Sequence, residues 1–254
     1  MSGKATRVGS TAAARPVSDT VMTGQSSPPD VAARPVAAVF DLDKTITRQA
    51  TYIPFLLSVA RHKVFKLLYV VPIVGAGLAY KIGLISRGRV KELMLTAILG
   101  KASRAEVAAY AEAFVAECVG RGLRPGALRA IAEHRARGHN LILATASFDF
   151  YVERLGRELG FDAVIATRSA WDESGRLLGR IDGENCYGAE KLRRLEEALP
   201  DLRGSYRVVA YSDSHVDLPL LCWADSGVAV NPSRRLRRRA RSGGLDVVDW
   251  NEVS

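Results

Sequence analysis

The chain has 254 residues, a hydrophobic content of 48% and a formal net charge of +9. This length suits one large domain, or a core domain with an inserted subdomain, and the composition allows a substantial buried core. The three cysteines lie far apart and form no C-x-x-C pair, which argues against a disulfide framework or a zinc site and favours a reducing compartment. Much of the positive charge falls in Arg234–Arg241, so it indicates a local basic patch.

Residues 1–35 are rich in Ala, Ser, Thr, Pro and Gly and show no apolar periodicity. We predict that they form a disordered N-terminal tail. The tail bears arginines and few acidic residues, so it resembles a transit peptide weakly, but it lacks the apolar region of a secretory signal. We therefore expect a cytoplasmic protein, with a peripheral position on the inner face of the cell membrane as a further option.

Residues 36–41 predict the first strand, because Ala37–Phe40 is a continuous apolar run of the kind found in a parallel strand buried on both faces. Asp41 and Asp43 follow directly, where ligands of open α/β sheets bind. Positions i and i+2 of an extended chain face the same way, so both carboxylates can face one substrate. Taken alone, such a pair is more often a helix cap followed by a polar loop.

Residues 49–122 contain helical patterns only, which predicts an all-helical insertion. Between the first two expected helices lies an uncharged apolar run, Leu67–Tyr80. This run is shorter than the roughly 20 residues that a membrane-spanning helix needs. The expected helices are Tyr52–His62, Arg87–Leu99 and Arg104–Val119.

From residue 123 onward, predicted strands and helices alternate. This alternation implies right-handed crossovers and a doubly wound, parallel α/β sheet. The core would then comprise residues 36–48 and 123–254. The expected helices are Pro125–Gly138, Phe150–Leu159, Glu190–Leu199 and Arg234–Arg241, and the expected strands are Leu141–Ala144, Ala163–Thr167, a hairpin at Leu177–Ile181, Tyr206–Tyr211, Gly227–Val230 and Val247–Trp250.

Other predicted strands also end in polar groups. Thr145 follows the second strand, and Asp213 and Asp217 follow the strand at Tyr206–Tyr211. Lys191 opens the helix that precedes the latter strand. Each residue alone suits a helix cap or a solvated charge. Because the carboxyl ends of parallel strands meet at one edge, their coincidence favours a single site.

These residue types suit phosphoryl transfer to water. The Asp41 carboxylate can attack phosphorus to give an aspartyl-phosphate, and Asp43 can protonate the departing alkoxide and then deprotonate the hydrolytic water. The Thr145 hydroxyl and the Lys191 ammonium can hold phosphoryl oxygens. Mg²⁺ prefers carboxylate oxygens and water. The candidate magnesium ligands are Asp41, Asp43, Asp213 and Asp217.

The order and spacing of four motifs resemble the haloacid dehalogenase superfamily over about residues 36–250. This resemblance implies a Mg²⁺-dependent aspartyl-phosphate mechanism with Asp41 as nucleophile and Asp43 as acid and base; the second aspartate favours a phosphatase over a dehalogenase. The helical insertion resembles the phosphoserine-phosphatase-like branch (subfamily IB), and within it the phosphatidylglycerophosphatase C group. The four motifs are DLDKT at 41–45, Thr145 after LILA, Lys191 in GAEKL, and SDSHVD at 212–217.

The apolar run Leu67–Tyr80 has basic residues on both sides, within residues 61–91. An apolar centre with basic edges is typical of a segment that lies in a membrane interface. The Arg234–Arg241 helix would add attraction to anionic lipid. We therefore expect a lipid phosphate monoester as substrate, with phosphatidylglycerophosphate as the first candidate.

Two alternatives remain open. The apolar run also suits the buried core of the insertion, and the protein would then be a soluble phosphatase for a small metabolite such as phosphoserine. A non-catalytic protein that binds nucleic acid or another anion through its arginines is a third hypothesis. The four intact motifs argue against this third hypothesis, so a nucleic acid partner is not expected.

Overall fold

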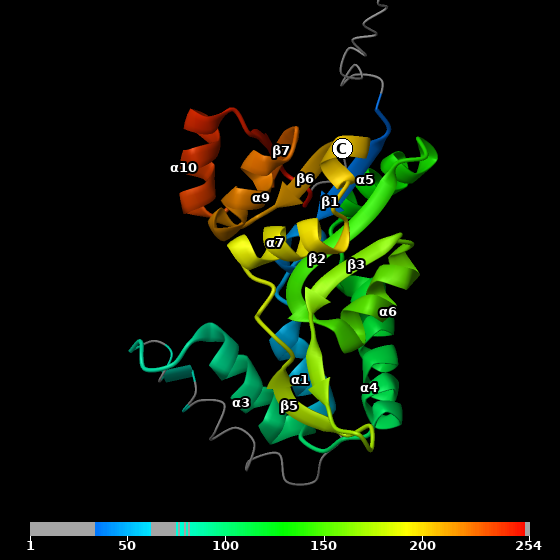
Figure 1. Ribbon diagram of the computed structural model, residues 1–254, viewed down its shortest axis with the longest axis vertical. Helices are drawn as coiled ribbons and strands as arrows, with labels where there is room; N and C mark the ends of the chain where they lie inside the picture. The colour runs from blue at the N-terminus through cyan, green and yellow to red at the C-terminus, as the bar shows by residue number, and fades with distance from the viewer. Residues whose placement is uncertain (1–33, 62–74, 76, 79, 81, 252–254) are drawn as a thin grey trace, which may run out of the picture.

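The computed structural model describes residues 34–61, 75, 77, 78, 80 and 82–251 (Figure 1). The predicted disordered tail therefore lies almost entirely outside the described residues, as does most of the apolar run Leu67–Tyr80. Pro35, at the end of the predicted tail, already meets the sheet, because its carbonyl oxygen accepts a hydrogen bond of 2.8 Å from the backbone N–H of Arg207.

The core is a six-stranded sheet with the strand order β3-β2-β1-β6-β7-β8, and every neighbouring pair is parallel. Strand order reverses between β1 and β6, which places a topological switch point beside β1. The predicted doubly wound α/β class is confirmed. The strands are β1 (Val36–Phe40), β2 (Asn140–Phe148), β3 (Ala163–Thr167), β6 (Arg207–Ser212), β7 (Ser226–Val230) and β8 (Asp246–Val248).

Strand β1 is buried because each of its faces packs into a separate apolar cluster. Ala38 and Phe40 lie in the cluster on one face of the sheet, and Ala37 and Val39 lie in the cluster on the other. All four side chains are inaccessible to solvent. Helices cover both faces, as Figure 1 shows. They are α5 (Pro125–Ala136) and α6 (Asp149–Leu159) on the first face, and α7 (Ala189–Ala198), α8 (Leu202–Ser205), α9 (Leu218–Trp223) and α10 (Arg234–Gly243) on the second.

Helix α6 shows how the sequence sets this packing. Tyr151, Leu155 and Leu159 recur at intervals of four, so they form one apolar stripe that faces the sheet. Burying each such side chain contributes roughly 1.5–3 kcal/mol to folding. The helix ends at Gly160, whose φ of 72° is the left-handed conformation that glycine adopts without strain.

Strand β2 is longer than predicted. We expected it to end at Ala144, but it continues through Thr145 to Phe148, with an irregular register against β3 over its last residues. Thr145 and Ser147 are polar yet buried. The Thr145 hydroxyl oxygen accepts a hydrogen bond of 3.1 Å from the Ser147 backbone N–H. This bond gives a partner to both polar groups inside the buried part of the strand.

Among the described residues between β1 and β2, three helices form a group that Figure 1 shows beyond one end of the sheet. Aromatic contacts join two of them to Tyr151 of the core: the Phe55 ring stacks on the Tyr151 ring at 4.8 Å, and the Phe114 ring meets it edge-on at 5.6 Å, between ring centroids. Within the described residues, no helix is both long enough and apolar enough to cross a membrane. The helices are α1 (Tyr52–Ala60), α3 (Arg87–Leu99) and α4 (Arg104–Glu117).

A β-hairpin completes this helical layer. Strands β4 (Ser169–Trp171) and β5 (Leu177–Ile181) pair antiparallel to each other, apart from the main sheet, and β5 packs along α3. The Thr96 hydroxyl donates to the Gly179 carbonyl oxygen at 3.0 Å. Gly179 has a φ of 68°, and a Cβ there would lie 2.2 Å from Thr96 Oγ1, so only glycine fits. The hairpin was predicted from its sequence, but its packing on α3 was not.

Candidate active site

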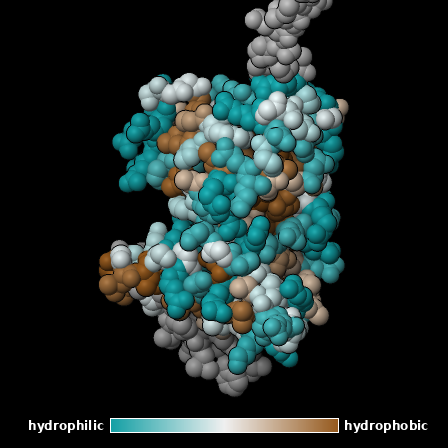
Figure 2. All heavy atoms as spheres, in the orientation of Figure 1, coloured by the Kyte–Doolittle hydropathy of each residue, from teal (hydrophilic) through white to brown (hydrophobic). Residues whose placement is uncertain are grey.

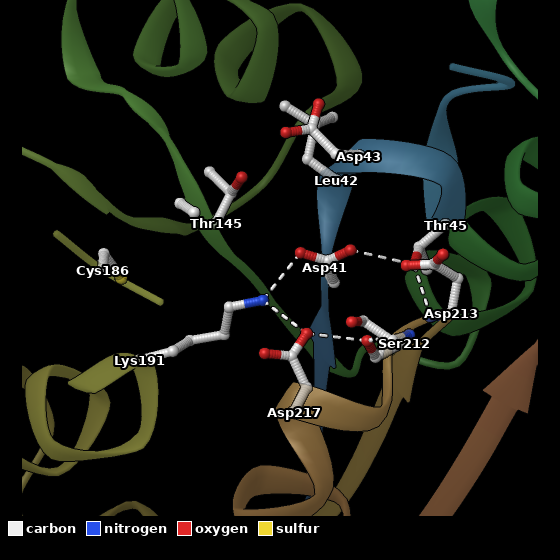
Figure 3. Close-up of polar contacts among 12 residues, drawn as sticks. Asp41, Leu42, Asp43, Thr45, Thr145, Cys186, Lys191, Ser212, Asp213 and Asp217 are labelled. Atoms are coloured by element: carbon white, nitrogen blue, oxygen red, sulfur yellow. Dashed lines mark hydrogen bonds and ion pairs between the residues drawn. The ribbon is translucent and has the colours of Figure 1, made fainter. Parts of the chain in front are cut away.

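The predicted site residues gather around the ends of β1 and β6 and the last part of β2, and Lys191 reaches them from α7 (Figure 3). Asp41 follows β1 directly, and its backbone N–H donates to the Tyr211 carbonyl oxygen of β6 at 2.9 Å. Asp217 ends the short turn His215–Asp217 that follows β6. The topology alone therefore brings together groups that are distant in the sequence, as the strand-end argument predicted.

Lys191 joins two carboxylates at the centre of the site. Its Nζ donates to Asp41 Oδ1 at 2.7 Å and to Asp217 Oδ2 at 2.8 Å. All three side chains are nearly inaccessible to solvent. Ser212 Oγ also donates to Asp217 Oδ2 at 2.7 Å, so one Asp217 oxygen is fixed from two sides. Lys191 is thus a buried ion-pair centre and not a solvated helix residue.

Thr45 holds the other side of Asp41. Its hydroxyl donates to Asp41 Oδ2 at 3.0 Å and accepts a hydrogen bond of 2.9 Å from the Asp213 backbone N–H. This bridge ties the turn after β1 to the loop after β6. The turn itself depends on Lys44, which adopts a left-handed φ of 65° and brings Thr45 back toward Asp41.

The Asp43 carboxylate lies in a separate hydrogen-bond network. Asp43 Oδ1 accepts from the Thr51 backbone N–H and hydroxyl, both at 2.7 Å, and Asp43 Oδ2 accepts from Ser147 Oγ at 2.8 Å. The Thr51 hydroxyl also lies 3.0 Å from the Tyr151 hydroxyl. Figure 3 shows Asp43 apart from the Asp41 and Asp213 carboxylates. Because β1 ends at Phe40, the i, i+2 rule of an extended strand does not orient Asp43.

Thr145 lies on β2 with its side chain fully buried. Its hydroxyl oxygen accepts from the Ser147 backbone N–H, which leaves its own O–H free to donate toward the site. The structure thus places Thr145, Lys191, Asp213 and Asp217 around Asp41, and it places Asp43 at one side. Sequence reasoning missed Thr51 and Tyr151, because nothing in their local sequence marks them as partners of a carboxylate.

Comparison with known proteins decides the family. The profile of the haloacid dehalogenase-like hydrolases matches residues 38–221, which is more than half of the chain. The chain belongs to the haloacid dehalogenase-like hydrolases. The resemblance inferred from its four motifs is confirmed at this level.

Named relatives of this hydrolase include proteins from several bacteria. It is 34% identical to Protein CicA of Caulobacter vibrioides over 75% of this chain and 84% of the relative. It is 28% identical to a phosphoserine phosphatase of Mycobacterium tuberculosis, over 84% of this chain and 70% of the relative. A crystal structure of a Bordetella pertussis protein of unknown function superimposes with a TM-score of 0.76 at 27% identity, covering 85% of this chain and 99% of that one.

Negative charge is in excess at the centre of the hydrolase site. Burial raises the pKa of Asp41 to about 7; Lys191 acts against this rise, and the charges of Asp217 and Asp213 add to it. Burial likewise raises the pKa of Asp213 to about 6. Burial disfavours the Lys191 ammonium, but the carboxylates of Asp217 and Asp41 outweigh burial and raise its pKa. Two ammonium groups therefore act on three carboxylates: Lys191 on Asp41 and Asp217, and Lys44 chiefly on Asp213.

The donor chemistry of this centre fits a hard divalent cation. Asp217 Oδ1 is a buried oxygen that has no hydrogen-bond partner among the described residues, and such an atom is costly unless something binds it. Asp41 and Asp213 supply further carboxylate oxygens, the ligand type that Mg²⁺ prefers. Among the described residues, however, no three acidic, histidine or cysteine side chains form a preorganised metal cluster. The Asp43 carboxylate is bound by Thr51 and Ser147 instead, so the side chains of the four predicted magnesium ligands do not meet at one point.

We expect Mg²⁺ to stabilise the hydrolase more near pH 8 than near pH 5. The raised pKa values of Asp41 and Asp213 mean that the folded protein keeps protons that the unfolded chain releases. Their contribution to metal-free stability therefore falls as the pH rises from about 4 to 7. A bound cation replaces these protons, so its stabilising effect should grow over the same window. Melting temperatures with and without Mg²⁺ at both pH values test this, and an equal shift at the two pH values contradicts it.

Proposed function

We propose that this hydrolase is a Mg²⁺-dependent phosphatase that hydrolyses a phosphate monoester through an aspartyl-phosphate on Asp41. The observation that carries the proposal is the division of the two aspartates between separate networks. Asp41 is fixed by Lys191 and Thr45, which leaves it positioned to attack. Asp43 is held by uncharged donors, Thr51 and Ser147, and is suited to moving a proton.

In the first step, a carboxylate oxygen of Asp41 forms a bond to phosphorus while the ester P–O bond breaks. The departing alkoxide takes a proton from the Asp43 carboxyl group. In the second step, Asp43 accepts a proton from a water molecule as its oxygen attacks phosphorus. The bond between phosphorus and Asp41 then breaks, which releases inorganic phosphate and restores both side chains.

Thr145 and Lys191 would hold the phosphoryl oxygens during both steps. The Thr145 O–H and the Lys191 ammonium are donors already fixed by burial, so they need little reorganisation when charge develops on those oxygens. Asp41, Asp213 and Asp217 would hold Mg²⁺, which when bound supplies positive charge that offsets the anionic phosphoryl group and the carboxylates. This assignment leaves Asp43 outside the metal site.

Replacing Asp43 with Asn should lower kcat by roughly a hundred- to ten-thousandfold, because the variant cannot donate or accept the proton. Asn keeps the size of the side chain and can still accept hydrogen bonds from Thr51. Steady-state phosphate release measures the effect. The matched variant Ser147→Ala removes only one of the donors to Asp43 and should cost much less. A kcat for Asp43→Asn close to that of Ser147→Ala would rule out proton transfer by Asp43.

The comparisons favour a small, soluble phosphate monoester as the substrate. One relative is named a phosphoserine phosphatase, and another, at 27% identity over 60% of this chain, is named a histidinol-phosphatase. We infer that residues 49–122 act as a cap over a core of residues 36–48 and 123–254. The packing of β5 along α3 supports this inference, because it holds the insertion against the core half of the chain.

A specific observation supports a lipid phosphate as a second candidate. Leu78, Ile82 and Leu84 are 61%, 63% and 74% exposed, and they precede the basic N-terminus of α3. Figure 2 shows this apolar surface at the tip beside α3. Exposed apolar side chains next to arginines suit an anionic membrane interface. On this proposal phosphatidylglycerophosphate is the substrate, and α10 provides a second basic surface.

A phosphate-release screen with Mg²⁺ separates the candidates by comparing phosphoserine, histidinol phosphate and phosphatidylglycerophosphate. Flotation with anionic vesicles is the companion measurement. Turnover of the soluble esters by a protein that does not float supports the first candidate. Preferred turnover of the lipid by a protein that floats supports the second. If purified protein releases phosphate from none of these esters, nor from p-nitrophenyl phosphate, the phosphatase proposal is wrong.

A further inference from the structure

Lys91 is a buried cation that the proposed mechanism does not use. It lies on α3, and its side chain crosses from the insertion to the core. Its Nζ donates to the Ala146 carbonyl oxygen at 2.5 Å and to Asn185 Oδ1 at 3.0 Å. The ammonium also lies 4.6 Å from the centroid of the Phe148 ring. Ala146 directly follows Thr145, so Lys91 reaches the wall of the candidate active site.

Unlike Lys191, Lys91 has no carboxylate partner. Within the described part of the chain, no ion pair includes it. Burial lowers the pKa of Lys91 to about 8, although the charge of Asp43 acts in the opposite direction. An ammonium has three donors, and the two acceptors leave one N–H without a partner among the described residues. A buried charge without a counterion is costly, so this position favours an incoming anion.

The surroundings of Lys91 can accommodate such an anion. Its partner Asn185 lines a cavity of about 460 Å³ between the start of α3 and the loop before α7. Arg87 and Arg89 line the same cavity. Two of its acidic residues pair with arginines: Glu92 with Arg89, and Glu190 with Arg193 and Arg194 outside the cavity. Arg87 and Glu184 also line it and form no ion pair among the described residues, so the cavity walls carry both signs, and the unpaired positive charge beside Asn185 is that of Lys91.

The geometry also indicates which part of a substrate would meet Lys91. Under the proposed mechanism, Asp43 protonates the departing oxygen, so the alcohol portion of the ester leaves on the side of Asp43. Lys91 Nζ donates to the carbonyl oxygen of Ala146, and the next residue, Ser147, donates its hydroxyl to Asp43. Lys191, in contrast, is the cation beside Asp41. Lys91 therefore lies on the side of the alcohol portion, and Lys191 on the side of the phosphoryl group.

We propose that Lys91 binds a second anionic group on the alcohol portion of the substrate and so restricts the enzyme to monoesters that carry one. This inference rests on the proposed phosphatase function and narrows its substrate class. Both candidate substrates satisfy it, because phosphoserine carries a carboxylate and phosphatidylglycerophosphate carries a phosphodiester. Histidinol phosphate, which has no second anion, does not. Lys91 would thus determine specificity without taking part in bond breaking.

Two matched pairs of substrates test the inference. Phosphoserine differs from phosphoethanolamine by one carboxylate, and phosphatidylglycerophosphate differs from phosphatidate by a glycerol phosphodiester. For the natural chain we expect kcat/KM to be roughly ten- to hundredfold higher for the first member of one pair than for its partner. This factor corresponds to the free energy of one hydrogen bond to a charged group. A preference within the soluble pair identifies a carboxylate as the group that Lys91 binds. A preference within the lipid pair identifies a phosphodiester as that group.

The Lys91→Met variant should abolish that preference, and Lys91→Arg should retain part of it. The ratio of two kcat/KM values within one preparation does not depend on the fraction of folded enzyme. Equal losses on both members of a pair would show a structural role and overturn the inference, as would a natural chain without preference in either pair. Turnover of p-nitrophenyl phosphate reports separately on the proposed phosphatase function.

Binding provides a measurement that needs no turnover. Asp41→Asn protein should bind phosphoserine or phosphatidylglycerophosphate more tightly than its matched partner, and the additional Lys91→Met change should equalise the two affinities. Calorimetric titration measures both. Equal affinities before the Lys91 change, or no binding of any of the four esters, would overturn the inference. A preference in binding together with no turnover of any ester would instead contradict the proposed phosphatase function alone.

Discussion

Replacing Asp41 with Asn should lower kcat by more than about a thousandfold, because the variant loses the nucleophile and with it the covalent route. The fold should survive. Burial raises the pKa of Asp41, so its charged form is disfavoured in the folded protein, and a neutral amide of the same shape removes that cost. Lys191 keeps Asp217 as an ion-pair partner. We expect a melting temperature without metal that is unchanged or higher.

Phosphate release and thermal unfolding, measured on the same preparations, check this expectation. Asp201→Asn is the matched control, because Asp201 is exposed, lies at the start of α8 and makes no side-chain capping bond. The control should keep full activity. An Asp41→Asn protein that is folded and retains a tenth or more of the activity would exclude Asp41 as the nucleophile.

Replacing Lys191 with Met should destabilise the folded protein by about 3–5 kcal/mol, the usual effect of removing one member of a buried ion pair. Lys191 is only 2% exposed, and its loss leaves Asp41 and Asp217 buried without a cation. Replacing Asp217 as well removes one of the two unpaired carboxylates and should recover part of the lost free energy of unfolding. The double variant Lys191→Met/Asp217→Asn should therefore be more stable than Lys191→Met alone. Phosphate release should also fall sharply, because a phosphoryl donor is lost.

Denaturant unfolding in metal-free buffer measures these free energies. Arg193→Met is the control on the same helix: Arg193 is 58% exposed and pairs with Glu190 and Glu197 on the surface, so its replacement should change stability little. Equal unfolding midpoints for the Lys191 and Arg193 variants would show that the buried ion pair contributes no more than a surface pair.

The site centre was predictable because topology alone assembles it. An apolar strand followed by Asp41, and a second one followed by Asp213 and Asp217, suffice to place these carboxylates at one edge of a parallel sheet. Lys191 was predicted as a phosphoryl donor from its place at the start of the helix before β6, but its burial was not, since a lysine near a helix start has no signature of burial. The structure then shows it inaccessible to solvent between two carboxylates.

The surroundings of Asp43 could not be predicted in the same way. Its donors come from the start of α1 and from β2, segments whose proximity depends on how α1 packs against α6. Likewise, Lys91 occupies a helix whose sequence also suits a solvated surface. Its burial follows from tertiary contacts without local periodicity, with Ala146 and Phe148 of β2 and with Asn185 in the loop before α7. Strand β2 was predicted to end at Ala144 because polar residues follow it. In the structure it continues, with a hydrogen bond from the Ser147 backbone N–H to the Thr145 hydroxyl oxygen inside the strand.

The central claim is that a phosphoryl group is transferred to Asp41. Acid-quenched single turnovers with a ³²P-labelled monoester, followed by peptide mapping, test it most directly. We predict a transient, hydroxylamine-sensitive label on the peptide that contains Asp41, which is absent from Asp41→Asn protein. Turnover at full rate without any covalent label, or a label on a peptide that lacks Asp41, would contradict the account.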